Sequence, residues 1–355
     1  MRRDGGTTPG ECDSIAPPER PGTPDDGTDA GERVYVVRDV VFDQGGERWR
    51  NIGFDLDGRC SVPPDFADIE CQPRNASASP EPDGEGGIDN SFGHNLFPVV
   101  ELTVPGLEEV SRGYQARGIG AVLMQVNGWN GTANDARVEV VAAVTVFGTP
   151  GDAAMTEPPE VRQTPDGPET AGGDPLPEPT WDGNDWFWVR SDNFLDGQLS
   201  QPLVRDDNAY VAGNVLVIRL PERTDFIFPG EDLGLLVRLT GAVATARIDG
   251  GGASLTDITV AGRWPMFDLL DTAEAVGVCP GATEHDILLN QLDRIVDVRA
   301  TPGSGGGSVP CDAVSLGLKF EQGVQVRFAA LAEGDPVPDA CAAMGSDAGI
   351  PDAGM

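Results

Sequence analysis

The sequence predicts a mainly β protein, a β-sandwich of jelly-roll type with a few short helices and disordered termini. Runs of β-branched and aromatic residues recur along the chain, and glycine, proline or aspartate separates them. The 47 glycines and 30 prolines suit a fold with many turns. Only a few stretches have the hydrophobic spacing of an amphipathic helix.

The composition changes along the chain and predicts the domain organisation. Residues 1–32 are acidic, rich in glycine and proline and without aromatics, so we expect a disordered leader, and 342–355 predict a disordered tail. A single β-rich domain is expected over 33–341. Segment 148–180 is rich in proline and acids, and predicts a disordered insertion in that domain or a linker between two domains.

The first half predicts three strands and two short helices. Residues 33–43 are β-branched and aromatic and form the first strand. Helices are expected at 92–102, where a proline limits the length, and at 105–118, which a proline and a glycine bound. Strands follow at 119–131 and 136–147. Apolar residues on both faces of the latter predict that both faces are covered.

The second half is predominantly β in its pattern. A hairpin is expected where two strands flank three consecutive glycines at 250–252. Proline at the start and glycine at the end predict a helix over 265–277, and helical spacing predicts another over 285–298. The expected strands are 209–221, 223–229, 234–249, 253–264 and 314–328.

The net charge of −34 argues against nucleic acid and anionic membranes as partners. Such acidity also keeps a protein soluble, which is the ordinary explanation. A sharper one is binding of a divalent cation, because aspartate-rich loops supply the hard oxygen ligands that Ca²⁺ prefers. No stretch approaches the length of a transmembrane helix.

Six cysteines without a C-x-x-C pair favour disulfides over a zinc or thioredoxin-like site. Proximity in the sequence favours the pairs Cys60–Cys71 and Cys279–Cys311, which leaves Cys12–Cys341. Disulfides imply an oxidising compartment. The N-terminus has neither the apolar run of a signal peptide nor a lipobox before Cys12, so we expect the true start to lie upstream. The alternative is a cytosolic chain with free thiols.

Several short stretches resemble a group of uncharacterised extracytoplasmic, lipoprotein-like proteins of the myxobacteria. The resemblance implies an extracytoplasmic location, secreted, periplasmic or associated with the outer membrane, and a single structural unit, but it brings no function. It is carried by FDLDGRC (54–60), GIDN (87–90), GWNG (128–131), WDGNDWF (181–187), AYVAGNVLVIRLP (209–221), GVCPG (277–281) and CDAVSLGLKF (311–320).

The stretch FDLDGRC is the candidate metal site. Asp55 and Asp57 are two residues apart, so in an extended segment both carboxylates point the same way. The loop lacks the ligands of an EF-hand, but Asp83, Asp89 or Asn90 can complete an irregular Ca²⁺ site. In the alternative, Asp55 and Asp57 are turn residues and Asp89 or Asn90 is the N-cap of the next helix.

The tryptophans are the candidate ligand-binding residues. In WDGNDWFWVR, exposed indoles beside acids can form a platform on which a sugar stacks, whereas large aromatics more commonly fill a core. The hairpin tip NGWNGTAND offers a second ligand-facing indole. The residues concerned are Trp129, Trp181, Asp185, Trp186 and Trp188.

Catalytic signatures are weak in this sequence. It has two histidines, His94 and His285, and no G-x-S-x-G elbow, Walker A or G-x-G-x-x-G motif. We therefore expect a non-enzymatic structural or adhesive protein, calcium-stabilised, whose partners are polysaccharide or cell-envelope components. The alternatives are a carbohydrate-binding module that uses the tryptophans and a glycoside hydrolase, which needs only two carboxylates in a cleft.

Overall fold

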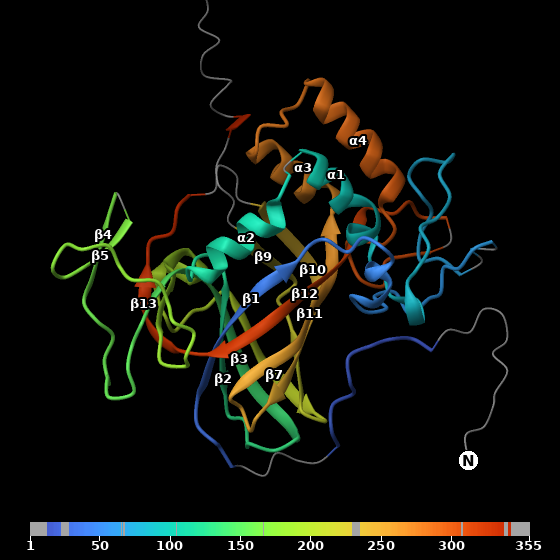
Figure 1. The fold of residues 1–355 in the computed structure, drawn as a ribbon. Helices are drawn as coiled ribbons and strands as arrows, with labels where there is room; N and C mark the ends of the chain where they lie inside the picture. The colour runs from blue at the N-terminus through green and yellow to red at the C-terminus, as the bar shows by residue number, and fades with distance from the viewer. Residues whose placement is uncertain are drawn as a thin grey trace, which may run out of the picture.

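Eight antiparallel strands form a closed barrel in the computed structural model, which describes residues 13–22, 28–64, 66, 68–103, 105–165, 167–228, 235–306, 308–336 and 340–341. Their order around the wall is β1–β2–β3–β7–β8–β10–β11–β12, and the pairing of β3 with β7 closes the ring (Figure 1). The barrel strands are β1 (Arg33–Val41), β2 (Val122–Asn127), β3 (Asn134–Thr149), β7 (Val204–Ala212), β8 (Val215–Arg219), β10 (Leu235–Asp249), β11 (Ser254–Pro265) and β12 (Ala313–Gln325).

The remaining elements extend or cover this barrel. Beyond its barrel half, β3 pairs with β6, and β6 pairs in parallel with β13. The first half of β10 pairs with β9, and β4 and β5 form a separate hairpin. These strands are β4 (Val161–Thr164), β5 (Gly167–Thr170), β6 (Trp186–Arg190), β9 (Arg223–Phe228) and β13 (Arg327–Ala332). The helices are α1 (Phe97–Thr103), α2 (Leu107–Ala116), α3 (Met266–Ala275) and α4 (Thr283–Ile295), with one-turn helices at Arg48–Asn51, Glu85–Gly87, Ser191–Asn193 and Leu195–Gly197 and a π-helical turn at Phe92–Leu96.

The prediction of a mainly β chain is confirmed, but the jelly-roll sandwich is replaced by a closed barrel. Alternation of apolar residues shows that a strand has one buried face, and both architectures satisfy that pattern. The barrel closes through β3 and β7, which a long excursion separates in the sequence. Strand length makes this closed arrangement possible, because β3 and β10 are long enough to pair with different partners at their two ends.

Two hydrophobic cores lie on opposite faces of the same wall. The first fills the barrel and extends under the helices. The second lies on the outer face of β1, β2 and β3, where Val36, Leu123 and Ala143 pack with Phe187 and Val189 of β6. This second layer explains why residues 136–147 are apolar on both faces, as predicted.

The four α-helices gather at one end of the barrel, at the top of Figure 1. The chain passes directly from β11 into α3, and Pro265 is the N-cap residue, one position before the first helical residue. Buried Leu269, Leu270 and Leu292 join the barrel core from α3 and α4. The three glycines of the expected hairpin all have positive φ and connect β10 to β11.

Two segments that were expected to be disordered are ordered where the structure describes them. In the leader, residues 13–22 lie against the folded domain: Ile15 exchanges hydrogen bonds with Gly86 and Asp55, and the Tyr210 hydroxyl donates to the Pro18 carbonyl at 2.6 Å. The tail 342–355 lies outside the described residues. Segment 148–180 contains the β4–β5 hairpin, and Gln163 exchanges two hydrogen bonds with the backbone of Glu333. Strands from both sides of this segment join one sheet.

Candidate metal site

Three aspartates from two loops converge beside the barrel. Carboxylate oxygens of Asp55, Asp57 and Asp89 all lie within 4.8 Å of one another. The loops are joined by the backbone, since the Asp89 N–H donates to the Phe54 carbonyl at 3.1 Å. The first loop lies so close to β12 that a Cβ on Gly317 would stand 2.1 Å from the Ile52 carbonyl oxygen, so this position requires glycine.

Each of these aspartates, and Asp83 beside them, binds one backbone N–H through one carboxylate oxygen. The second oxygen of each accepts no hydrogen bond from another described residue, and that of Asp55 is fully buried. The donors are Gly58 to Asp55 (2.6 Å), Arg59 to Asp57 (2.8 Å), Ser61 to Asp83 (2.5 Å) and Leu56 to Asp89 (2.7 Å). Asp55 and Asp57 therefore do act as turn residues, as the alternative proposed. These hydrogen bonds use one of the two carboxylate oxygens of each aspartate.

Burial and repulsion by neighbouring carboxylates disfavour the charged forms of Asp57, Asp83 and Asp89. Asp89 is 4% exposed and Asp83 is 8% exposed. Burial, and next the charge of Asp57, raises the pKa of Asp89 well above its ordinary value. Burial raises the pKa of Asp57 to about 6 and that of Asp83 to about 8, against the hydrogen bonds that they accept.

Sequence reasoning missed one member of this group, Asp297. It follows α4, is half-buried, and accepts hydrogen bonds from the backbone N–H of Ser315 at 2.8 Å and from the Ser315 hydroxyl. Burial raises its pKa to about 7, and the charges of Glu81 and Asp57 add to this rise. An aspartate inside the apolar run Ile295–Val298 was the available signal, because an acid at such a position is buried with a partner.

Two arginines lie near the cluster, and the charge of Arg59 lowers the pKa of Asp57, although by less than burial raises it. The Arg59 guanidinium pairs with Asp68 at 2.5 Å. Arg263 of β11, 3% exposed, donates to the Leu56 carbonyl and forms no ion pair with these aspartates in the described part of the chain. Half-buried and buried carboxylates this close together repel one another, which is costly unless some of the carboxyls are protonated or a metal neutralises them.

Asn90, which the sequence offered as a further ligand, has a structural role instead. Its Nδ2 donates to Gln44 Oε1 at 2.6 Å and to the Ile52 carbonyl at 2.8 Å. Its Oδ1 accepts the N–H of Gly93 at 3.0 Å, as an N-cap residue does, and that of Gly317 at 3.1 Å. With these bonds made, Asn90 has no group left for a metal, and its bond to the Gly93 N–H is of the kind that the N-cap alternative requires.

The disulfides tie the loops of this region to the barrel, but not in the predicted pairs. Cys71 is bonded to Cys311 and Cys279 to Cys341, so all three proposed pairs are wrong. Cys60 is also disulfide-bonded, and Cys12 lies outside the described residues. Proximity in the sequence misled here because loops far apart in the chain meet at the same end of the barrel.

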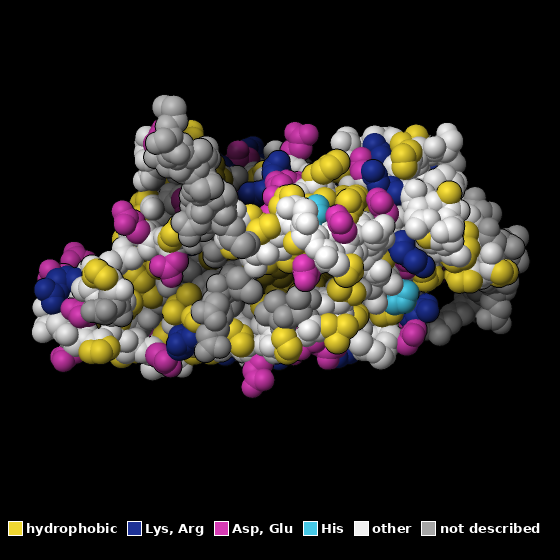
Figure 2. All heavy atoms as spheres, turned by 90° about the horizontal axis from the view of Figure 1, so that it is seen from above, with side chains coloured by type: hydrophobic (Ala, Val, Ile, Leu, Met, Phe, Trp, Pro, Cys, Tyr) yellow, Lys and Arg dark blue, Asp and Glu magenta, His cyan; other side chains and the backbone are white. Residues whose placement is uncertain are grey.

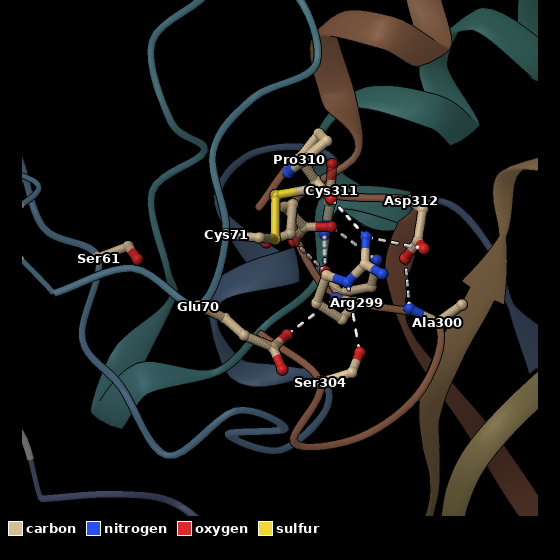
Figure 3. The surroundings of a disulfide bond; sticks show 12 residues. Ser61, Glu70, Cys71, Arg299, Ala300, Ser304, Pro310, Cys311 and Asp312 are labelled. Atoms are coloured by element: carbon tan, nitrogen blue, oxygen red, sulfur yellow. Dashed lines mark hydrogen bonds and ion pairs between the residues drawn. A yellow bond between two sulfur atoms is a disulfide. The ribbon is translucent and has the colours of Figure 1, made fainter. Parts of the chain in front are cut away.

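Figure 3 shows how polar contacts surround the Cys71–Cys311 bond. Arg299 pairs with Asp312 at 2.8 Å and donates to the Pro310 carbonyl at 2.5 Å. Its backbone N–H donates to Glu70 Oε2 at 2.8 Å, next to the disulfide. The disulfide and this network together hold the loop that ends at Cys71 against the start of β12.

The tryptophans of WDGNDWFWVR lie in the interior. Trp186 and Trp188 are each 7% exposed, and Trp188 stacks on Phe147 with ring centroids 4.9 Å apart. Trp181 is partly buried, donates through Nε1 to the Ala116 carbonyl, and has the Arg38 guanidinium over its ring at 4.3 Å. These positions present no open platform to a sugar. The stretch contains a core strand, in agreement with the alternative that its aromatic residues fill a core.

The other predicted ligand-binding residues are also structural. Asp185 is fully buried and accepts hydrogen bonds from Thr180 and from the Trp181 N–H. Trp129 is 2% exposed and belongs to the barrel core, and its Nε1 donates to the Thr132 carbonyl at 2.9 Å. Among the candidate residues that the structure describes, buried polar atoms without a hydrogen-bond partner remain at Asp55 Oδ2 and at Trp186 Nε1, and only the aspartates also form a group of three possible metal ligands.

Comparison with known proteins gave no match: no family model, no curated protein and no solved structure is similar to this chain. The disulfides indicate an oxidising, extracytoplasmic environment. None of the helices in the described part of the chain is both long and apolar enough to cross a membrane. Inference about function therefore depends on the physical chemistry of the sites.

Proposed function

We propose that this chain is a non-enzymatic structural or adhesive protein of the cell envelope or its exterior, stabilised by Ca²⁺ at Asp55, Asp57 and Asp89. The observation that carries the proposal is the meeting of three carboxylates within 4.8 Å, each with an oxygen free of hydrogen bonds to described residues. A bound cation would offset the cost of burying them together. The envelope setting agrees with the disulfides and with the resemblance that the sequence carries.

The oxygen-only donor set supports Ca²⁺ among the common cations. Ca²⁺ takes six to eight oxygen ligands in irregular geometry, and Asp83 is placed to supply a further one directly or through water. Extracellular Ca²⁺ sites are commonly weak, with dissociation constants of about 10⁻⁴ to 10⁻³ M. A glycoside hydrolase needs only two carboxylates in a cleft, whereas three converge here, which favours metal binding over that alternative.

Calcium is expected to raise the melting temperature of the oxidised protein relative to EDTA. A ligand that binds only the folded state adds about 2.7 kcal/mol at a hundredfold excess over its dissociation constant. The shift should disappear in the double variant Asp55→Asn, Asp57→Asn. Asp182→Asn is the matched control, because exposed Asp182 accepts the N–H of Asn184 in the same kind of turn but lies outside the cluster.

Thermal melts and calorimetric titration with Ca²⁺ and Mg²⁺ check this expectation. Mg²⁺ should stabilise less, because it requires near-octahedral geometry and dehydrates reluctantly. Absence of a shift in the unmodified protein at about 10 mM Ca²⁺, well above the expected dissociation constant, would count against the site. A shift that persists in the double variant would place the calcium elsewhere.

The raised pKa values predict that the metal-free protein loses stability as the pH rises. Burial raises the pKa of Asp83 from 3.8 to about 8 and that of Asp297 to about 7. Between pH 3.8 and these values the folded protein holds protons that the unfolded chain releases, so the free energy of unfolding falls across this window.

Melts in EDTA from about pH 5 to about pH 8 measure this dependence. Saturating Ca²⁺ should flatten it, because the cation favours the ionised carboxylates. Asp83→Asn should flatten it as well, since the amide oxygen can still accept the Ser61 N–H. A melting temperature that increases over this range in EDTA would contradict the expectation.

A further inference from the structure

The described part of the leader, residues 13–22, forms a strap that contacts the candidate metal loops at one end. The Ile15 N–H donates to the Gly86 carbonyl at 2.8 Å, and the Ile15 carbonyl accepts the Asp55 N–H at 2.9 Å. Asp55 belongs to the three-carboxylate group, and Gly86 lies three residues before Asp89, another member of it. The strap therefore joins the backbones of the two loops that bring the carboxylates together.

The strap fits closely against the second of these loops at Gly86. A Cβ on this glycine would stand 2.5 Å from Ile15 Cγ1 and 2.6 Å from the Asp13 carbonyl oxygen. Its φ of 59° also lies in the left-handed region, which favours glycine. A larger residue at this position would therefore displace the strap without removing a carboxylate.

The other end of the strap lies on the seam of the barrel, where β3 pairs with β7 to close the ring. The ladder between these strands has two register shifts within residues 135–140 of β3, and such shifts leave backbone groups outside the ladder. The Arg20 guanidinium donates to the carbonyl of Ala136 on β3, at 2.5 Å, and to the carbonyl of Asn208 on β7. Arg20 therefore bridges the two strands where their own pairing is interrupted.

Tyr210 of β7 holds the strap between its two ends. Its hydroxyl donates to the Pro18 carbonyl at 2.6 Å, and the Arg20 guanidinium lies over its ring, 4.7 Å from the centroid. Most strap residues are exposed, and the strap, dark blue in Figure 1, runs along the outside of the barrel. Because little burial holds it, a modest free energy at one end decides how firmly the whole strap is docked.

Calcium can act on the strap at a defined place. Among the described residues, Asp55, Asp57 and Asp89 form the group of three possible metal ligands. On the helical end of the barrel, by contrast, acidic side chains are dispersed among hydrophobic and basic ones (Figure 2). Cations act on such dispersed charges by screening, which sodium chloride at equal ionic strength reproduces.

We propose that the strap couples the calcium site to the seam, so that Ca²⁺ bound at the aspartates stabilises the pairing of β3 with β7. This inference rests on the proposed calcium site. Ca²⁺ fixes the two loops, the loops hold Ile15, and the docked strap keeps Arg20 on the carbonyls of both strands. Coupling between two sites is reciprocal, so a docked strap also strengthens calcium binding. Arg20, whose hydrogen bonds to described residues go to the seam, is thus a positioning residue for the metal site.

Calcium titration and hydrogen exchange of the oxidised full chain test this coupling. We expect saturating Ca²⁺ to slow exchange in peptides covering 134–142 and 204–212, beyond the effect of sodium chloride at equal ionic strength. Arg20→Gln should remove this protection and weaken calcium binding about fivefold, the lower end of the range for coupled sites. Arg247→Gln is the matched control, because Arg247 of β10 forms an exposed ion pair with Asp257 on the same barrel.

Gly86→Ala tests the other end of the strap. It should weaken calcium binding at least as much as Arg20→Gln and should also speed exchange at the seam. Gly106→Ala is its control, since Gly106 has a φ of 75° and a Cβ there would meet no described atom within 4 Å. Thermal melts establish that each variant is folded. Arg20→Gln changes an exposed side chain, so it decides the question even if Gly86→Ala does not fold.

The outcomes separate this coupling from the calcium site itself. A calcium-induced rise in melting temperature without slower exchange at the seam would overturn the coupling and leave the calcium site in place. No rise at all would remove the calcium site and the coupling with it. Equal calcium affinity in Arg20→Gln and Arg247→Gln, or equal protection of the seam by sodium chloride, would also overturn the coupling.

Discussion

Replacing Trp188 with alanine is expected to lower the free energy of unfolding by about 3–5 kcal/mol, the usual cost of removing a buried aromatic. Trp188 stacks on Phe147 and packs with Trp186 and Ala332. Its strand, β6, joins β3 on one side to β13 on the other. The alanine variant leaves a cavity in the layer that holds these strands together, and urea unfolding measures the loss.

Phe267→Ala is the matched control for this prediction, because Phe267 is 69% exposed on α3. Its replacement should change stability by no more than about 0.5 kcal/mol. A small loss for Trp188→Ala, together with loss of polysaccharide-induced quenching of tryptophan fluorescence, would contradict the core role. It would restore the carbohydrate-binding alternative.

Removal of the Cys71–Cys311 disulfide by a double serine variant is expected to cost about 2–5 kcal/mol. The bond joins residues 240 positions apart, so it restricts the unfolded chain strongly. It also ends the loop that starts near the aspartate cluster. We therefore expect the calcium-induced shift in melting temperature to decrease in this variant.

The Cys279–Cys341 bond provides the comparison, since it joins residues only 62 positions apart. Loop-closure entropy predicts that its removal costs about 1 kcal/mol less than removal of Cys71–Cys311. It lies beside α3 and α4, so its loss should leave the calcium response intact. Equal calcium responses in the two variants would show that the Cys71–Cys311 bond does not support the metal site.

The sequence alone identified most of the elements, but the run 209–221, expected as one strand, is the end of β7 and the whole of β8, joined by a turn at Gly213 and Asn214. Residues 33–43, 265–277 and 285–298 form the expected strand and helices, with ends shifted by a few residues. The hairpin around Gly250–Gly252 pairs as expected. These features depend on local properties, namely backbone freedom at glycine, the fixed angle of proline and the period of apolar residues, and a single sequence records all of them.

Part of the candidate metal site could likewise be found from local sequence. Asp55 and Asp57 are neighbours in a loop, and their pairing with Asp89 could be suggested from composition. The fate of Asn90 could not, because five hydrogen-bonding partners from three parts of the chain satisfy it. Asp297 was missed because nothing in its own neighbourhood shows that Ser315 and the aspartates approach it.

By itself, then, the sequence determined the β class, the positions of strands and helices, the acidic loop and an oxidising compartment. Only the tertiary structure decided that the sheet closes into a barrel, which cysteines pair, and that Trp129, Trp186 and Trp188 are buried. The physical reason is range. Alternation and turn chemistry act over a few residues, whereas closure, disulfide pairing and burial depend on contacts between segments such as β3 and β7 or Cys71 and Cys311, whose approach no local pattern encodes.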